Sequence, residues 1–329
     1  MEPKLINRRA FDAAQLMRAY PPRWTNENKL TAAGELLRRD DVPRGEVSLS
    51  RWRQGHRWST RSSHKRPLIT ERSGFFVYGE SGPPGTMHWH LNFAMGDCFG
   101  AYAGELLAQD ELQVLEHPAL GSLREAANLE GFSLMCVEDP AATPLLVAGI
   151  ERRGELKTRS SPEAPAGLYG NEFASASQAT VRSAMRRLEP PTISNIVAIE
   201  APACGSGRYE RDEIEAILST AVCGFRAAKL ETRHLTQGRA GDARVVLHTG
   251  WWGCGAYGGD KELMALLQLL ASELAEVDEL VFYSVDEDGS QTLREARRKY
   301  TALPKDAAAD DLVSAIWALR YEWGFSNGT

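Results

Sequence analysis

A glycine-rich segment at residues 249–260 has the composition of an anion-binding loop. It reads Thr-Gly-Trp-Trp-Gly-Cys-Gly-Ala-Tyr-Gly-Gly-Asp and holds five glycines. An apolar run at 245–248 precedes it, and a helical pattern with leucines on one face follows at 261–276. In a strand–loop–helix unit, backbone N–H groups and the helix N-terminus can together hold a phosphate, and glycines let the backbone approach it closely. The segment lacks the Lys-Ser/Thr pair of a Walker loop, and a tight structural turn is the alternative interpretation.

A second segment, Gln109-Asp110-Glu111, places two adjacent carboxylates beside an amide. It precedes a helical pattern that continues from Leu112. Side chains at adjacent helix positions point about 100° apart, so both acids can act on one substrate only at the first turn of that helix. Acids at a helix N-terminus are also stabilised by the helix dipole, which is the purely structural interpretation.

The glycine-rich segment resembles the C-terminal signature of the poly(ADP-ribose) glycohydrolase family. That signature reads T-G-N-W-G-C-G-A-F-G-G-D and continues into a leucine-rich helix that contains glutamine. Residues 249–268 repeat this pattern, with Trp251 in place of asparagine and Tyr257 in place of phenylalanine. Further matches keep the family's order and extend from about residue 75 to about residue 290. They are residues 196–201 and 221–225, which resemble I-V-A-I-D-A and A-Y-C-G-F, and residues 91–95 and 109–111, which resemble V-D-F-A-N and the catalytic Q-E-E.

The resemblance implies an ADP-ribosyl glycohydrolase, which cleaves a ribosyl O-glycosidic bond in poly(ADP-ribose) or an ADP-ribosylated target and releases ADP-ribose. Such cleavage needs an acid to protonate the leaving oxygen and a means to stabilise an oxocarbenium-like transition state. Glu111 matches the family's catalytic glutamate, which implies a general acid that then activates water. Asp110 matches the preceding, ribose-holding glutamate, and Gln109 matches a substrate-orienting glutamine. No cofactor is implied.

The same resemblance implies a set of substrate contacts. Tyr169 is similar to a tyrosine that covers the adenosine end, and Tyr283 lies near the position of an aromatic that stacks on adenine. The implied substrate-binding residues are Asn92, Phe99, Gly100, Ala101, Tyr169, Gly253, Cys254, Gly255, Ala256, Tyr257 and Tyr283.

Departures from the family pattern gather on the ribose side. The three-glycine cluster is here Phe99-Gly100-Ala101, the family's aspartate is Asn92 and its asparagine is Met95. The phosphate loop is retained almost intact. Two alternatives therefore stay open: a hydrolase that removes single ADP-ribose units from protein or nucleic acid, and a non-catalytic ADP-ribose reader. The Gln-Asp-Glu triplet favours an enzyme.

Two histidines, His88 and His90, alternate on an expected strand and share one face, as metal ligands could. The sequence shows no Cys, Asp or third His beside them, so we expect no metal site. Five scattered cysteines without C-x-x-C spacing fit reduced thiols and a cytoplasmic location. No apolar run approaches 18 residues and no signal core follows the N-terminus, so we expect no membrane contact.

Short apolar strands alternate with amphipathic helices along the chain, which predicts an α/β fold. With the resemblance, the expectation is a macrodomain-like mixed sheet sandwiched between helices at 71–329, after a helical and basic N-terminal extension at 1–70. Helices are expected at 11–17 and 31–39 of this extension, and a loop or linker at 44–67.

The first 72 residues carry sixteen Lys/Arg against eight Asp/Glu, although the whole chain has a net charge of −6. The basic residues are densest at 51–66, where Trp52 and Trp58 are interleaved with them. Such a segment could contact a polyanion with stackable bases. Covering the acidic remainder of the protein, or forming a linker, are the alternatives.

Overall fold

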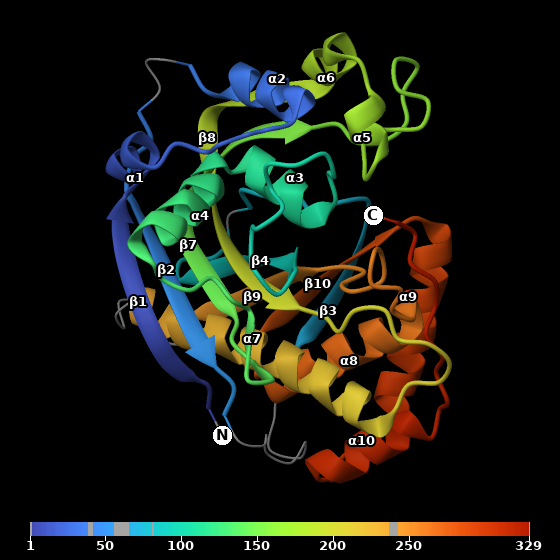
Figure 1. Ribbon diagram of the computed structural model, residues 1–329. Helices are drawn as coiled ribbons and strands as arrows, with labels where there is room; N and C mark the ends of the chain where they lie inside the picture. Colours follow the sequence, from blue (N-terminus) through green and yellow to red (C-terminus); the bar gives the residue numbers. More distant parts are fainter. Residues whose placement is uncertain (1, 39–41, 56–65, 81, 237–242, 329) are drawn as a thin grey trace.

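The computed structural model describes residues 2–38, 42–55, 66–80, 82–236 and 243–328. Within these residues, eight strands form one mixed sheet in the order β1-β2-β7-β8-β4-β9-β10-β3 (Figure 1). They are β1 (Lys4–Asp12), β2 (Glu46–Arg53), β3 (Leu68–Ser73), β4 (Thr86–Ala94), β7 (Leu145–Leu156), β8 (Met185–Glu200), β9 (Arg244–Thr249) and β10 (Glu279–Val285). A small hairpin pairs β5 (Val137–Glu138) with β6 (Ala141–Ala142).

The five strands β8, β4, β9, β10 and β3 are parallel, and β7, β2 and β1 continue the sheet in antiparallel pairs. Carboxyl ends of parallel strands meet at one edge of a sheet, where open α/β sheets bind their ligands. The loops after β4, β8 and β9, at 95–108, 201–210 and 250–260, therefore emerge at the same edge.

One face of the sheet is covered by the C-terminal helices (Figure 1). These helices are α7 (Arg211–Thr236), α8 (Lys261–Leu274), α9 (Glu287–Ala302) and α10 (Ala309–Trp317). Trp89 and Leu91 of β4 join their core because strand side chains alternate between the faces. Burial of this apolar face supplies the main core.

The opposite face of β4 carries His88, His90, Asn92 and Ala94, a polar run on a mostly buried strand. Helices α1 (Ala13–Ala19), α2 (Glu27–Leu36), α3 (Gln109–Glu116), α4 (Pro118–Glu130), α5 (Glu172–Ser175) and α6 (Gln178–Ala184) complete the structure on this side (Figure 1). The two polar regions described below both lie along this face of β4.

The N-terminal segment differs from its expected form. The loop or linker predicted at 44–67 was wrong for residues 46–53, which form β2, and residues 4–12 form β1. Val47 and Leu49 of β2 point into the core, an alternation hidden by the basic composition of the segment. The sheet thus runs across the boundary predicted at residue 70.

Three residues of the predicted polyanion segment, 51–53, are part of the sheet, and two of them are buried. Arg51 is buried, donates to the Met135 carbonyl at 3.0 Å and to Thr143 Oγ1 at 3.1 Å, and lies 3.6 Å from a Glu138 oxygen. The Trp52 indole is buried and donates to Ser50 Oγ. Both side chains are therefore buried inside the protein and are not available to a polyanion. Residues 56–65 of this segment lie outside the described residues. None of the helices described is long and apolar enough to cross a membrane.

Candidate functional site

The two adjacent acids lie in the first turn of α3. Both are buried, with 5% of Asp110 and 4% of Glu111 exposed. Ala108, the N-cap residue, has no side-chain acceptor, and Glu111 Oε2 instead accepts a hydrogen bond from the Ala108 N–H at 3.0 Å. The capping hydrogen bond gives a structural role to one oxygen of Glu111. A helix N-terminus does not require that two carboxylates be buried, because burial of charge is costly.

Burial changes the protonation of this acid pair. The pKa of Asp110 is raised to about 7, by burial first and by the charge of Glu111 second, while a 3.0 Å hydrogen bond from Asn92 Nδ2 opposes the shift. Burial likewise raises the pKa of Glu111. Interacting acids titrate as a pair. The pair therefore holds a proton near neutral pH.

Lys29 was not expected here. It is a fully buried residue of α2, and its Nζ donates to the carbonyls of Tyr102 at 2.8 Å and Leu106 at 2.6 Å. Burial lowers its pKa to about 8, against the opposing effect of the Glu111 and Asp110 charges. A sequence signal existed, because Lys29 shares the apolar helix face of Ala32, Ala33 and Leu36.

Gln109 fastens the start of α3 to β4. Its Oε1 accepts from the Phe93 N–H at 2.7 Å, and its Nε2 donates to the Leu91 carbonyl at 3.0 Å. Both ends of the amide are therefore taken by backbone, which suits a positioning residue. The hydroxyl of Tyr169 accepts from the Gln109 backbone N–H, so Tyr169 does lie beside the acid pair.

The loop after β4 also contacts the acid pair. Phe99 has a φ of +59°, its side chain is buried, and its backbone N–H donates to Asp110. A Cβ at Gly100 would lie 2.8 Å from the Asp97 carbonyl oxygen, so the turn at 97–101 requires glycine there. The backbone of Phe99 is thus the part that faces the carboxylates.

The glycine-rich segment forms the turn between β9 and α8, as predicted. Within the part of the chain that the structure describes, the N–H groups of this segment that make no hydrogen bond include those of Gly253, Gly255, Ala256 and Tyr257. The Cys254 thiol is turned toward the Trp252 carbonyl, and burial raises its pKa, which disfavours a nucleophilic thiolate. The backbone is therefore the part of this loop suited to a ligand.

Glu200, at the end of β8, joins the two loops. Its carboxylate accepts hydrogen bonds from the Gly96 backbone N–H and the Tyr257 hydroxyl. Burial raises its pKa, and both hydrogen bonds oppose that shift. Glu200 thereby links the loop after β4 to the glycine-rich loop at one edge of the sheet.

Tyr283 is separated from these residues. Its side chain is 2% exposed, and its hydroxyl lies 3.2 Å from His248 Nδ1 and accepts from the Val77 N–H at 3.2 Å. Its ring packs edge-on against Phe76. This placement disagrees with the expected stacking on adenine and puts Tyr283 in a cluster of histidines.

Residues 165–292 match the family model of poly(ADP-ribose) glycohydrolase, with the macro domain fold. The structure is similar to the glycohydrolase of Thermomonospora curvata bound to the inhibitor ADP-HPD, with 16% identity, 87% of this chain and 97% of that chain covered, and a TM-score of 0.43. It is also similar to that of Deinococcus radiodurans in complex with ADP-ribose, with 14% identity, coverage of 90% and 94%, and a TM-score of 0.39. The family match and the mixed sheet between helices confirm the fold class predicted from sequence.

Proposed function

We propose that this chain hydrolyses a ribosyl O-glycosidic bond and releases ADP-ribose, starting from the match of residues 165–292 to the poly(ADP-ribose) glycohydrolase family model. One observation carries the proposal. A buried acid pair that holds a proton near neutral pH lies at the same sheet edge as a glycine loop whose N–H groups at 253 and 255–257 have no hydrogen bond to any described residue.

The glycine loop would bind the diphosphate of ADP-ribose. Backbone N–H groups gathered in a turn form a site for phosphate oxygens, and α8 begins directly after the loop. The N–H groups of Gly253, Gly255, Ala256 and Tyr257 are the donors. A side chain at Gly255 would occupy the place of the ligand.

The acid pair would perform the cleavage. Glu111, when protonated, gives its proton to the leaving oxygen, and as a carboxylate it then activates water. Asp110, held by Asn92 and the Phe99 N–H, would face the ribose. Lys29 would stabilise the charged form of the acid pair, and Gln109 would fix the position of the acid pair relative to β4.

A second candidate keeps the chemistry and changes the substrate. Asn92 Nδ2 donates to both Asp110 Oδ1 and Gln113 Oε1, so its amide has no hydrogen left for a ribose. Fewer ribose contacts favour removal of single ADP-ribose units from protein or nucleic acid. The full chain should therefore be incubated with polymer, mono-ADP-ribosylated protein and ADP-ribosylated nucleic acid, with released ADP-ribose measured. No release from any of the three would exclude the enzyme proposals and leave a reader.

The ligand assignment has its own test. Gly255→Val should weaken ADP-ribose binding by about 100-fold or more, because a branched side chain covers the N–H donors. Calorimetry with ADP-ribose measures this, and circular dichroism checks that the variant is folded. An unchanged affinity would make the loop purely structural.

Of residues 51–66, proposed to contact a polyanion, Arg51 and Trp52 are excluded because both are buried and hydrogen-bonded within the sheet. The contact would rest on residues 56–66. Binding of a long substrate should then weaken with salt more steeply than binding of free ADP-ribose, because more counterions are released. Neutralising Arg57, Arg61, Lys65 and Arg66 should remove that difference. Equal salt slopes for both ligands in the unmodified chain would end this proposal.

A further inference from the structure

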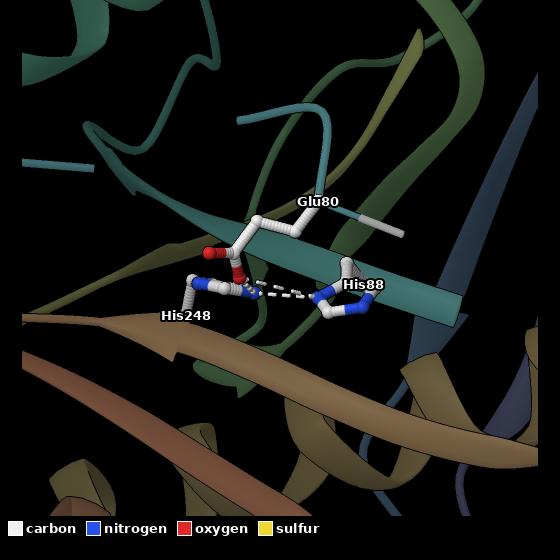
Figure 2. A group of neighbouring side chains, drawn as sticks. All are labelled: Glu80, His88 and His248. Carbon is white, nitrogen blue, oxygen red and sulfur yellow. Dashed lines mark hydrogen bonds and ion pairs between the residues drawn. The ribbon is translucent and has the colours of Figure 1, made fainter. Parts of the chain in front are cut away.

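A second group of polar side chains lies on the same face of β4, toward the start of the strand. His88 of β4, His248 of β9 and Glu80 of the segment after β3 point toward one another (Figure 2). His88 Nδ1 lies 2.9 Å from His248 Nε2, and each of these nitrogens lies 3.9 Å from Glu80 Oε2. Asn92 follows four residues later, about 13 Å along the strand, so this cluster is distinct from the acid pair.

We propose that Glu80, His88 and His248 bind a divalent transition-metal ion of the Zn²⁺ type. The point equidistant from the three ligand atoms lies about 2.1 Å from each, and Zn²⁺ bonds to imidazole nitrogen and carboxylate oxygen are about 2.0–2.2 Å long. A two-histidine, one-carboxylate set is a known donor set for this ion. The proposal is independent of the glycohydrolase proposal.

Surrounding residues orient the ligand atoms. Arg72 forms an ion pair with Glu80 through Oε1, which leaves Oε2 directed at the two imidazoles. His248 Nδ1 lies 3.2 Å from the Tyr283 hydroxyl, so this nitrogen can carry the ring proton while Nε2 keeps its lone pair. Metal-binding histidines and carboxylates are usually held in this way by a second hydrogen bond.

The hydrogen shared between His88 Nδ1 and His248 Nε2 moves to His88 Nε2, which has no partner among the described residues, when an ion binds. His90 is not a ligand, because its Nε2 faces the Val77 carbonyl at 3.1 Å. Its ring stacks on His248 at 4.2 Å and fixes the plane of that imidazole.

A cavity of about 450 Å³ adjoins the cluster. It is lined by Arg72, Gly79, Glu80, His88, Val246, Glu279 and Val281. Three protein ligands beside open space leave a fourth coordination position for water or another small ligand. The ion would also tie the segment that carries Glu80 to β4 and β9, so metal binding should stabilise the fold.

The test uses the full chain, purified without a polyhistidine tag and stripped with chelator. Zn²⁺ should bind with one equivalent per chain and a Kd of about 1 μM or tighter, and should raise the melting temperature. Co²⁺ should give the visible bands of a four-coordinate ion without thiolate-to-metal charge transfer, since the proposed ligands include no cysteine.

Glu80→Gln and His88→Gln should each weaken Zn²⁺ binding by about 100-fold and abolish the metal-dependent rise in melting temperature. His234→Gln, at an exposed histidine of α7, is the matched control and should change neither. Lack of stoichiometric binding by the unmodified chain would overturn the proposal. Thiolate charge transfer would do the same, as would unchanged affinity in both ligand variants. If a variant fails to fold, the Co²⁺ spectrum of the unmodified chain decides alone.

Discussion

The acid pair of α3 and the histidine cluster meet the same face of β4 at Asn92 and at His88, four residues apart, and the same physical effect acts on them in opposite directions. Burial disfavours charge, so it raises the pKa values of Asp110 and Glu111 and lowers those of His88 and His248. The acids thereby keep a proton that can be given away. The histidines lose theirs and keep lone pairs. One buried strand face therefore contacts a proton donor near one end and a group of electron-pair donors near the other.

A cationic side chain lies beside the acid pair and another beside the histidine cluster, and the two act differently. Lys29 reaches the acid pair from α2 and favours its ionised form, which keeps the pair able to release its proton. Arg72 instead binds Glu80 directly and holds that carboxylate toward the histidines. The comparison predicts that substitutions in the acid region alter rates and pH dependence, whereas those in the histidine cluster alter metal binding.

The largest effect is expected from Glu111→Gln. The amide keeps the shape of the side chain and loses its proton, so hydrolysis should fall by about 100-fold or more while ADP-ribose affinity stays within about threefold. Initial rates and calorimetry on the same preparation measure both. A residual rate above about a tenth of the unmodified rate would remove Glu111 as the acid, and a greater loss in Asp110→Asn would exchange the two roles.

Asp110→Asn should remove the part of the free energy of unfolding that the unmodified chain loses as the pH rises. The folded-state pKa of Asp110 is about 7, above the ordinary 3.8, so the folded state holds this proton more tightly than the unfolded state. The stabilisation is complete below pH 4 and is lost as the pH rises through 7. The variant lacks this group and should gain up to about 2–4 kcal/mol over the unmodified chain between pH 5 and pH 8. Urea unfolding at both pH values tests this, and a constant difference would contradict it.

Lys29→Met should have the smallest effect on the reaction and a clear signature. Without the buried cation, the pKa values of the acid pair rise, and the alkaline limb of kcat/KM should move up by about half to one pH unit. The loss of donors to the Tyr102 and Leu106 carbonyls should also lower the free energy of unfolding by about 2 kcal/mol. Lys4→Met, at an exposed position, is the control. A purely structural Lys29 would change stability and leave the pH profile in place.

Local patterns in the sequence predicted part of this molecule well. The glycine loop and α8 after it were foreseen, because turn chemistry and helix periodicity act over a few residues. The first-turn position of the acids in α3 was only the condition under which both could act on one substrate. β1 and β2 were missed, since basic composition masked the alternation of Val47 and Leu49. Local sequence cannot state which distant strands become neighbours.

The missed site residues share that cause. Lys29 lies in a segment assigned to an extension, and it is the fold that brings α2 to the acid pair. His248 is 160 residues from His88 and meets it only because β9 pairs with β4. The pair His88 and His90 was noticed through its spacing, yet the structure joins His88 to His248 and Glu80 and leaves His90 out.

The strand order also bears on how the chain is made. Both borders of the sheet come from the first 73 residues, with β1 and β2 at one side and β3 at the other. β3 at 68–73 pairs with β10 at 279–285, and β2 at 46–53 pairs with β7 at 145–156. During synthesis β3 therefore leaves the ribosome long before its partner strand, with an exposed strand edge that invites association.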